Sequence, residues 1–253
     1  MFQFKQFSIR QDLCAMKVGT DGVLLGAWAS GGRRILDVGT GTGVIALMMA
    51  QRFPDAQVTA IDIDEDAVRQ AQANVAASPF SNRVVVLHSS LQDFCSPPSD
   101  ILHHPSDILP SSFSSIVSNP PFFVNALKAP DRQRSVARHA DTLTFTELMQ
   151  GASRLLADDG ELSVIIPFDY RRRMEDEALF AGFFPSRLCA VRTTDSKPPR
   201  RYLLAFRKHP CPLQREELTI ASDAYRRLTH DFYLDTQALQ ALQPLQLFLN
   251  DFC

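Results

Sequence analysis

Short runs of aliphatic and β-branched residues alternate along the chain with longer stretches in which apolar residues recur at helical spacing. The short runs have the length and composition of buried strands. Strands that alternate with helices favour a mainly parallel sheet covered by helices on both faces. The pattern therefore predicts an α/β fold with seven strands. These strands are expected at residues 34–38, 57–61, 83–87, 113–117, 161–166, 187–192 and 202–207.

Local signals mark the boundaries of several other segments. Pro54 ends a predicted helix over residues 44–53, because proline cannot continue a helix. Asp64 is a suitable N-cap for a helix over residues 65–77, since its carboxylate can accept from the free N–H groups of the first turn. Residues 96–115, rich in Ser, Pro and His, predict a surface loop inserted before the fourth strand.

The chain after residue 208 departs from the alternation of strands and helices. It opens with prolines, offers a short strand near Leu218 and a helix over residues 225–233, and ends in a tail rich in Leu and Gln. A chain of 253 residues with 45% hydrophobic residues suits one domain with small additions. We therefore expect a single domain, with a core over residues 34–208 and a C-terminal extension over residues 209–253.

Charge and cysteine content narrow the functional classes. The formal net charge of −2 is not typical of a nucleic-acid-binding domain, so any RNA contact must come from local basic patches. The five cysteines are scattered without a CxxC pair or a nearby histidine cluster, which predicts free thiols in a reducing cytosol and no metal site. The polar start and the lack of an 18-residue apolar stretch predict neither a signal peptide nor a membrane span. These features indicate a cytoplasmic location.

A glycine-rich turn at residues 37–43 (DVGTGTG) follows the first predicted strand. Glycines let the backbone approach a ligand closely, and the helix that follows presents free N–H groups and a positive dipole end. The spacing is G-x-G-x-G after an acid, whereas a dinucleotide-binding turn is expected to read G-x-G-x-x-G. The turn resembles motif I of the class I methyltransferases, whose acid and turn hold the amino-acid part of the cofactor. A tight turn without a ligand is the alternative.

Polar residues also follow the second and third predicted strands. Asp62 lies 19 residues after Gly43, near the spacing of about 20 at which an acid accepts the hydroxyls of a ribose. Asp64 is better explained as a helix cap. In many class I methyltransferases an acid after the third strand contacts the cofactor's adenine, but Ser90 and Leu91 stand there in this chain. A hydroxyl or a backbone N–H can still bond the adenine.

The fourth strand runs into Asn119-Pro120-Pro121-Phe122, the most specific motif in the chain. It is similar to the N-P-P-[YF] motif of methyltransferases that modify planar nitrogens, namely adenine N6, guanine N2 and the glutamine amide. Such a nitrogen is a poor nucleophile, so two fixed acceptors, the Asn119 side-chain oxygen and the Pro120 carbonyl, would bind its hydrogens and aim its lone pair. Phe122 would stack on the target base. A proline-rich turn with Phe122 in the core is the alternative.

Residues 4–7 (FKQF) and 12–28 (DLCAMKVGTDGVLLGAW) carry the most distinctive resemblance. Together with the two motifs and residues 225–229 (YRRLT), they are similar to the bacterial tRNA1(Val) (adenine-37 N6)-methyltransferase family. The resemblance implies a Rossmann-like class I methyltransferase with a seven-stranded, mainly parallel sheet, one antiparallel strand and helices on both faces. It also implies S-adenosylmethionine as cofactor and tRNA as substrate. We further expect no metal, no membrane partner, and a monomer or weak dimer.

The resemblance further assigns roles to single residues. In an N-terminal segment over residues 1–33, Lys17, Gly19 and Thr20 are expected to help close the cofactor pocket, whereas the residues alone also suggest Thr20 or Asp21 as a helix N-cap. The expected cofactor-binding residues are Lys17, Gly19, Thr20, Asp37, Gly39, Thr40, Gly41, Gly43, Asp62, Ile63, Ser90, Leu91 and Asn119. The expected catalytic residues are Asn119, Pro120, Pro121 and Phe122.

Basic residues after the N-P-P-F motif form a candidate RNA-binding loop. Phosphates would be met beside the base pocket, so Arg134 and Arg138, with Phe122, are the expected substrate-binding residues. A solvated charged loop is the alternative. Each arginine of residues 171–173 is followed four positions later by an acid, which favours exposed ion pairs on a helix. Basic residues within 200–208 form another possible patch.

Four other functions remain open at this point. A guanine-N2 methyltransferase of ribosomal RNA uses the same turn. A protein-glutamine methyltransferase is expected to carry a separate helical domain in front, for which this chain leaves no room. A nicotinamide-dependent oxidoreductase would need G-x-G-x-x-G and no N-P-P-F motif. A catalytically silent RNA-binding module would not need intact Asp37, Asp62 and Asn119.

Overall fold

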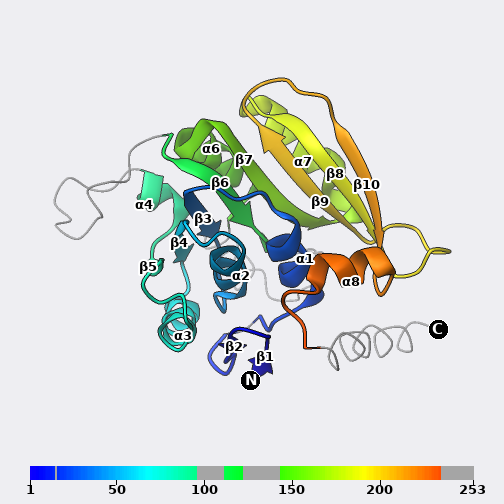
Figure 1. The fold of residues 1–253 in the computed structure, drawn as a ribbon. Coiled ribbons are helices and arrows are strands. Elements are labelled where there is room, and N and C mark those ends of the chain that lie inside the picture. Colours follow the sequence, from blue (N-terminus) through cyan, green and yellow to red (C-terminus); the bar gives the residue numbers. More distant parts are fainter. Residues whose placement is uncertain (15, 96–110, 122–142, 235–253) are drawn as a thin grey trace, which may run out of the picture.

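The structure is a computed structural model that describes residues 1–14, 16–95, 111–121 and 143–234. Its centre is a twisted sheet with helices on both faces (Figure 1). The strands, in spatial order, are β10 (Gln214–Thr219), β8 (Phe184–Arg192), β9 (Arg201–Arg207), β7 (Leu156–Pro167), β6 (Phe113–Ser118), β3 (Arg34–Val38), β4 (Gln57–Asp62) and β5 (Val84–His88).

Strand β9 is antiparallel to both of its neighbours, and all other neighbouring strands of this sheet are parallel. The predicted mainly parallel sheet with one antiparallel strand is therefore confirmed. The sheet has eight strands rather than seven, because β10 pairs with β8 over six residues. The segment around Leu218 thus joins the main sheet as an edge strand.

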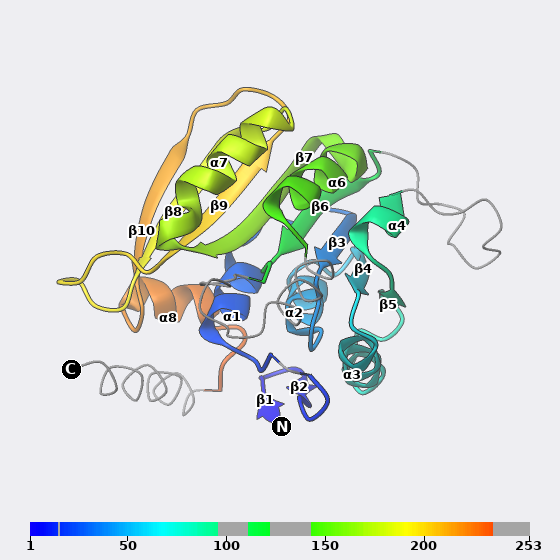
Figure 2. The same ribbon diagram turned by 180° about the vertical axis from the view of Figure 1, so that it is seen from behind.

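The helices cover the two faces in separate groups, as Figures 1 and 2 show. Each group packs on its own hydrophobic cluster, and the two clusters lie on opposite faces of the sheet. The first group comprises α1 (Thr20–Trp28), α2 (Val44–Arg52), α3 (Glu65–Ala76) and α8 (Asp223–Thr229). The second comprises α4 (Leu91–Cys95), α6 (Phe145–Leu155) and α7 (Arg171–Phe180), with a short 3-10 turn, η2 (Phe168–Tyr170), before α7.

Several boundaries differ from those expected from the sequence. Residues 113–115 belong to β6 and not to the inserted loop, because Phe113 is buried in the core at 1% exposure. Helix α8 begins earlier than predicted, where the Ser222 hydroxyl accepts from the Tyr225 N–H. Asp64 caps α3 as expected, accepting from the Asp66 N–H at 2.9 Å. Most of the predicted loop and the tail after Asp235 lie outside the described residues.

The N-terminal segment is held against both the core and the segment that follows α8. A hairpin of β1 (Phe2–Gln3) and β2 (Ser8–Ile9) places Phe4 between Phe7 and Tyr233, with both ring pairs stacked. The Asn74 side chain on α3 then accepts from the Arg10 N–H and donates to the Arg10 carbonyl, both at 2.8 Å. Asn74 also donates to the Thr42 carbonyl in the glycine turn at 2.9 Å. One buried amide therefore fixes the segment and the turn together.

Among the helices that the structure describes, none combines the length and the apolar character that a membrane span requires.

Candidate functional site

A cavity of about 840 Å³ opens at the carboxyl ends of the parallel strands. Three groups of residues that the sequence singles out meet in its wall. They are the N-terminal segment with Lys17, Gly19 and Thr20, the glycine turn with Gly39, Thr40 and Gly41, and Asn119 after β6. Ligands of open α/β sheets bind at this edge, so the cavity is the candidate functional site.

The glycine turn presents bare backbone to the cavity. Gly39, Gly41 and Gly43 have φ values of +72°, +55° and +82°, in the left-handed region that residues with a Cβ rarely adopt. The Gly39 and Thr40 N–H groups donate to the Ile61 carbonyl at 2.9 and 3.0 Å, which fixes the turn against the end of β4. The turn therefore leaves room for the predicted close approach of a ligand to the backbone.

Asp37 lies fully buried beneath the turn and does not itself line the cavity. One of its two carboxylate oxygens has hydrogen-bond partners and the other has none among the described residues. Oδ2 accepts from the Thr40 hydroxyl at 2.6 Å and from the Ala46 N–H of α2 at 3.1 Å. Oδ1 is buried without a hydrogen-bond partner among the described residues. Burial raises the pKa of Asp37 to about 7, against the lowering effect of the Thr40 and Ala46 hydrogen bonds. An unpartnered buried acceptor of this kind suits a cationic donor from a ligand.

This raised pKa predicts a pH-dependent stability. The pKa is above its unfolded value of 3.8, so the folded state binds the proton more tightly and loses stability as pH rises from about 4 to about 7. Urea unfolding at pH 5 and pH 8 should show Asp37→Asn removing roughly 2 to 3 kcal/mol of that pH dependence. An Asp37→Asn protein with the same pH dependence as the unchanged protein would show that Asp37 is ionised throughout.

Asp62 is half-buried behind the turn and does not line this cavity. Its Oδ2 accepts from the Gly41 N–H at 2.8 Å and its Oδ1 from the Asp64 N–H at 3.0 Å, while burial raises its pKa. Asp62 therefore shapes the turn, and a ribose would have to share these oxygens. The predicted ribose contact stays a prediction.

The expected cofactor-binding residues Ile63, Ser90 and Leu91 also lie outside the cavity wall. The Ile63 side chain is 52% exposed beside Asp62. The Ser90 hydroxyl caps α4, donating to Asp93 at 2.6 Å and accepting from its N–H at 3.0 Å. The Leu91 side chain is buried against the position of Gly151, so only its backbone remains for a ligand.

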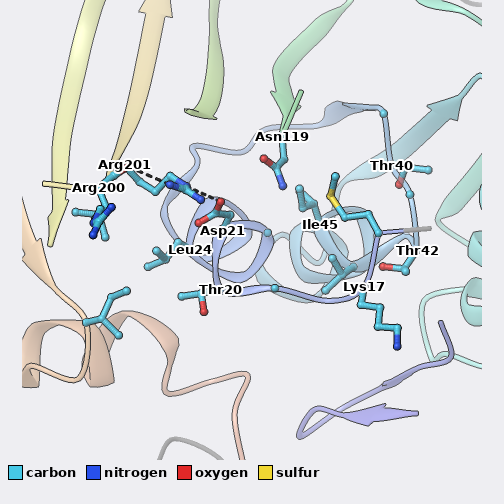
Figure 3. Close-up of a pocket in the computed structure, with 18 of the residues that line it drawn as sticks. Lys17, Thr20, Asp21, Leu24, Thr40, Thr42, Ile45, Asn119, Arg200 and Arg201 are labelled. Atoms are coloured by element: carbon cyan, nitrogen blue, oxygen red, sulfur yellow. Dashed lines mark hydrogen bonds and ion pairs between the residues drawn. The ribbon is translucent and has the colours of Figure 1, made fainter. Parts of the chain in front are cut away.

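Asn119 is placed at the cavity by the end of β6. The neighbouring Ser118 hydroxyl donates to the Val38 carbonyl at 2.8 Å, which ties the end of β6 to β3. Figure 3 shows the Asn119 side chain pointing into the cavity, with Thr40 and Thr42 on one side and Arg200 and Arg201 on the other. Its Oδ1 is buried without a hydrogen-bond partner among the described residues.

The rest of the chemistry motif is described only in part. Pro120 is buried and Pro121 half-buried directly after Asn119. Phe122, Arg134 and Arg138 lie outside the described residues, so their expected contacts with a base and with phosphates stay predictions.

The start of α1 differs from one of its two expectations. The N-cap is Gly19, no side chain caps the helix, and Thr20 and Asp21 are already helical. Asp21 instead pairs with Arg201, whose Nε lies 2.7 Å from its carboxylate (Figure 3). Thr20 or Asp21 as N-cap was therefore wrong, whereas Lys17, Gly19 and Thr20 do line the cavity.

The cavity wall opposite the glycine turn was not predicted. It is formed by Arg192 at the end of β8 and Thr193 after it, by Arg200 and Arg201 where β9 begins, and by Ile220 after β10. The Thr193 hydroxyl is another buried group without a partner among the described residues. No local motif marks these positions, because they reach the site only through the pairing of the last three strands of the sheet.

Ion pairs occupy only part of the two further basic patches, since none joins Arg172, Arg173 or Arg200 to an acid among the described residues. Arg171 pairs with Glu175 at 2.8 Å, as the spacing on α7 predicts. Arg207 and Lys208 pair with Glu161 and Asp158. In the described parts of the chain, no group of three or more His, Cys, Asp or Glu side chains is arranged to hold a metal ion.

The comparisons with known proteins all find similarity to methyltransferases. The family model described as "Methyltransferase small domain" matches residues 18–182. A curated relative from Bacteroides thetaiotaomicron, named tRNA1(Val) (adenine(37)-N6)-methyltransferase, is 46% identical over 92% of this chain and 97% of its own length. A relative of the same name from Trichodesmium erythraeum is 44% identical, with the same coverage of both chains. The solved structure of a predicted O-methyltransferase from Agrobacterium tumefaciens matches with a TM-score of 0.62 at 17% identity, covering 84% of this chain and 96% of that one.

Proposed function

The chain belongs to the family of bacterial tRNA1(Val) (adenine(37)-N6)-methyltransferases, and we propose that it transfers a methyl group to N6 of adenosine 37 in that tRNA. The observation that carries the proposal is the Asn119 side chain, which lines the cavity formed with the glycine turn and whose Oδ1 has no hydrogen-bond partner among the described residues. An acceptor without a protein donor at this place is available for an amine hydrogen of the target base.

The methyl donor is S-adenosylmethionine, which when bound supplies an electrophilic methyl group. The residues present fit its amino-acid part. The left-handed glycine turn leaves open space where a Cβ would stand at Gly39 and Gly41, and Asp37 has a buried oxygen free to accept from a cationic amine. Lys17, Gly19 and Thr20 would close the cavity beside the glycine turn from the N-terminal segment. Asp62, Ile63, Ser90 and Leu91 are proposed to meet the adenosine part from the neighbouring strand ends.

Catalysis by these residues would rest on positioning. The lone pair of the N6 amine is delocalised into the ring, so the amine needs acceptors that hold both hydrogens and direct the lone pair at the methyl carbon. Asn119 Oδ1 and the Pro120 carbonyl would be these acceptors, and the prolines keep the carbonyl in place before the substrate arrives. A carbon–nitrogen bond forms as the carbon–sulfur bond breaks, and the amine then loses its extra proton to solvent. No general base is required before attack.

The same arrangement can hold guanine N2 or a glutamine amide, so the proposed substrate needs a direct test. Purified protein with labelled S-adenosylmethionine should transfer label to unmodified tRNA and not to ribosomal RNA transcripts or to proteins. Digestion of the tRNA should yield N6-methyladenosine. Label in ribosomal RNA as N2-methylguanosine, or in protein, would overturn the proposed substrate while keeping the chemistry of the site.

We also propose that the protein acts in the cytoplasm, where its tRNA substrate is, as a monomer or a weak dimer. Light scattering after size exclusion at several protein concentrations should give the monomer mass at the lowest. A concentration-independent dimer would contradict this.

A further inference from the structure

An exposed aromatic side chain stands next to the wall of the cavity. Phe168 follows the carboxyl end of β7, and its N–H donates to the carbonyl of the wall residue Arg200 at 3.0 Å. Phe168 is 43% exposed, so part of its large apolar ring is accessible to a ligand. Its ring stacks on Tyr202, with centroids 5.5 Å apart and planes at 22°. The exposed part of the ring therefore lies away from Tyr202.

The platform beneath this ring is held firmly. Tyr202 is a buried residue of β9, and the Arg171 guanidinium lies 5.1 Å from its ring centroid. Arg171 is in turn fixed by Glu175 at 2.8 Å. Phe168 is thus preorganised by a backbone hydrogen bond and by a stacked, anchored neighbour. A preordered ring loses little conformational freedom when a flat ligand covers it.

The surroundings of Phe168 favour an anionic, aromatic ligand. Arg172 follows Phe168 by four residues, and the Arg200 carbonyl accepts from the Phe168 N–H. Both arginines are exposed, and no ion pair joins either of them to another described residue. Asp169 lies next to Phe168 and weakens the local positive charge, so stacking is the stronger of the two attractions. A nucleobase with its phosphate supplies both an aromatic face and a negative charge.

The distance from the catalytic motif suits a neighbouring nucleotide. Ser118 of β6 is paired with Val164 of β7, which puts Asn119 beside Ile165, three residues before Phe168. At roughly 3.3 Å per residue and 4.8 Å between strands, Phe168 lies about 11 Å from Asn119 along the sheet edge. A base drawn out of its stack and held at Asn119 leaves its neighbours without a stacking partner.

We propose that Phe168 stacks on the base of a nucleotide adjoining the target adenosine, and that Arg200 contacts the phosphate between them. This inference rests on the proposed function and adds a second nucleotide subsite to the same site. The subsite holds the RNA in register while Asn119 and Pro120 hold the target base. It contributes to tRNA binding and leaves the transfer step unchanged.

The first test compares two exposed phenylalanines near opposite ends of α7. Phe168→Ala should raise KM for tRNA about tenfold, in line with the loss of one base–aromatic stack, with kcat within about twofold. Phe168→Tyr should retain the stack and the normal KM. Phe180→Ala removes a ring that is 90% exposed at the last residue of α7, and should leave KM unchanged. Equal KM values for Phe168→Ala and Phe180→Ala would overturn the inference.

The second test separates stacking from a general loss of structure. Anticodon stem-loops with an abasic nucleotide at position 36 or at position 38 would be methylated by the unchanged protein and by Phe168→Ala. One of the two abasic RNAs should raise KM about tenfold with the unchanged protein and cause no further rise with Phe168→Ala. If the increase in KM caused by Phe168→Ala multiplied the increase caused by the missing base for both RNAs, the proposed contact would be contradicted. The proposed function has a separate contradicting result, which is that the unchanged protein does not methylate intact tRNA.

Discussion

Replacing Asn119 with alanine should lower kcat by about 10²- to 10³-fold, the range seen when one preorganised polar group that stabilises a transition state is removed. The melting temperature should stay the same or rise slightly. Asn119 Oδ1 is buried without a partner among the described residues, so its removal breaks no hydrogen bond within them. A group that is unsatisfied in the free protein lowers its stability, and that cost disappears with the side chain.

Three measurements on Asn119→Ala separate this role from a structural one. Single-turnover methylation gives the rate of transfer, thermal unfolding gives stability, and calorimetric binding of S-adenosylhomocysteine gives the state of the cofactor site. We expect a slow transfer rate with normal unfolding and binding changed by no more than a few-fold. Methylation at the normal rate would show that Asn119 does not direct the target amine.

Replacing Glu161 with alanine should destabilise the fold by about 3 to 5 kcal/mol. The change leaves the guanidinium groups of Arg187 and Arg207 without the carboxylate that they share. Glu161 is 2% exposed on β7 and accepts from the Ser30 hydroxyl at 2.6 Å and the Arg207 Nε at 3.0 Å. It also accepts from Ser186, and an Arg187 nitrogen lies 3.5 Å away. One buried carboxylate therefore connects three strands of the sheet with the segment after α1.

The matched control for Glu161 lies on the same strand. Asp158 is 81% exposed and pairs with Lys208 at 3.6 Å, so Asp158→Ala should change stability by less than about 1 kcal/mol. Urea unfolding of both variants at one pH measures the difference. Losses of similar size would show that burial of Glu161 adds nothing to its ion pairs. Cofactor binding per folded molecule should be normal in both, since neither residue lines the cavity.

The parts of the fold that follow local rules could be predicted from the sequence. Strands β3, β4 and β6 are short apolar runs, and their ends carry the glycine turn, Asp62 and Asn119 within a few residues. Strand β10 could not be placed in the sheet in the same way. Its first four residues are exposed and polar, and only Leu218 is buried, so the predicted short strand near Leu218 carries no pattern that assigns it to the main sheet. Its place follows from pairing with β8, which is non-local.

The site shows the same division. The contribution of Lys17, Gly19 and Thr20 could be predicted from the distinctive N-terminal string, and these residues line the cavity. The hydrogen bonds of Asp62 to Gly41 and Asp64 could not, because a sequence does not show which donors a carboxylate already meets. The wall with Thr193 and Arg200 depends on how the antiparallel strand β9 returns to the edge of the sheet. Such contacts between distant segments are set by tertiary packing alone.

The most direct test of the central claim is to locate the methyl group on the product. An unmodified tRNA1(Val) transcript and the same transcript with guanosine at position 37 would be incubated with the protein and S-adenosylmethionine, cleaved by a base-specific nuclease, and analysed by mass spectrometry. We predict one added methyl group on the fragment that holds adenosine 37, recovered as N6-methyladenosine, and none on the guanosine transcript. A methyl group at another position, N2-methylguanosine in either RNA, or no RNA product would contradict the proposed function.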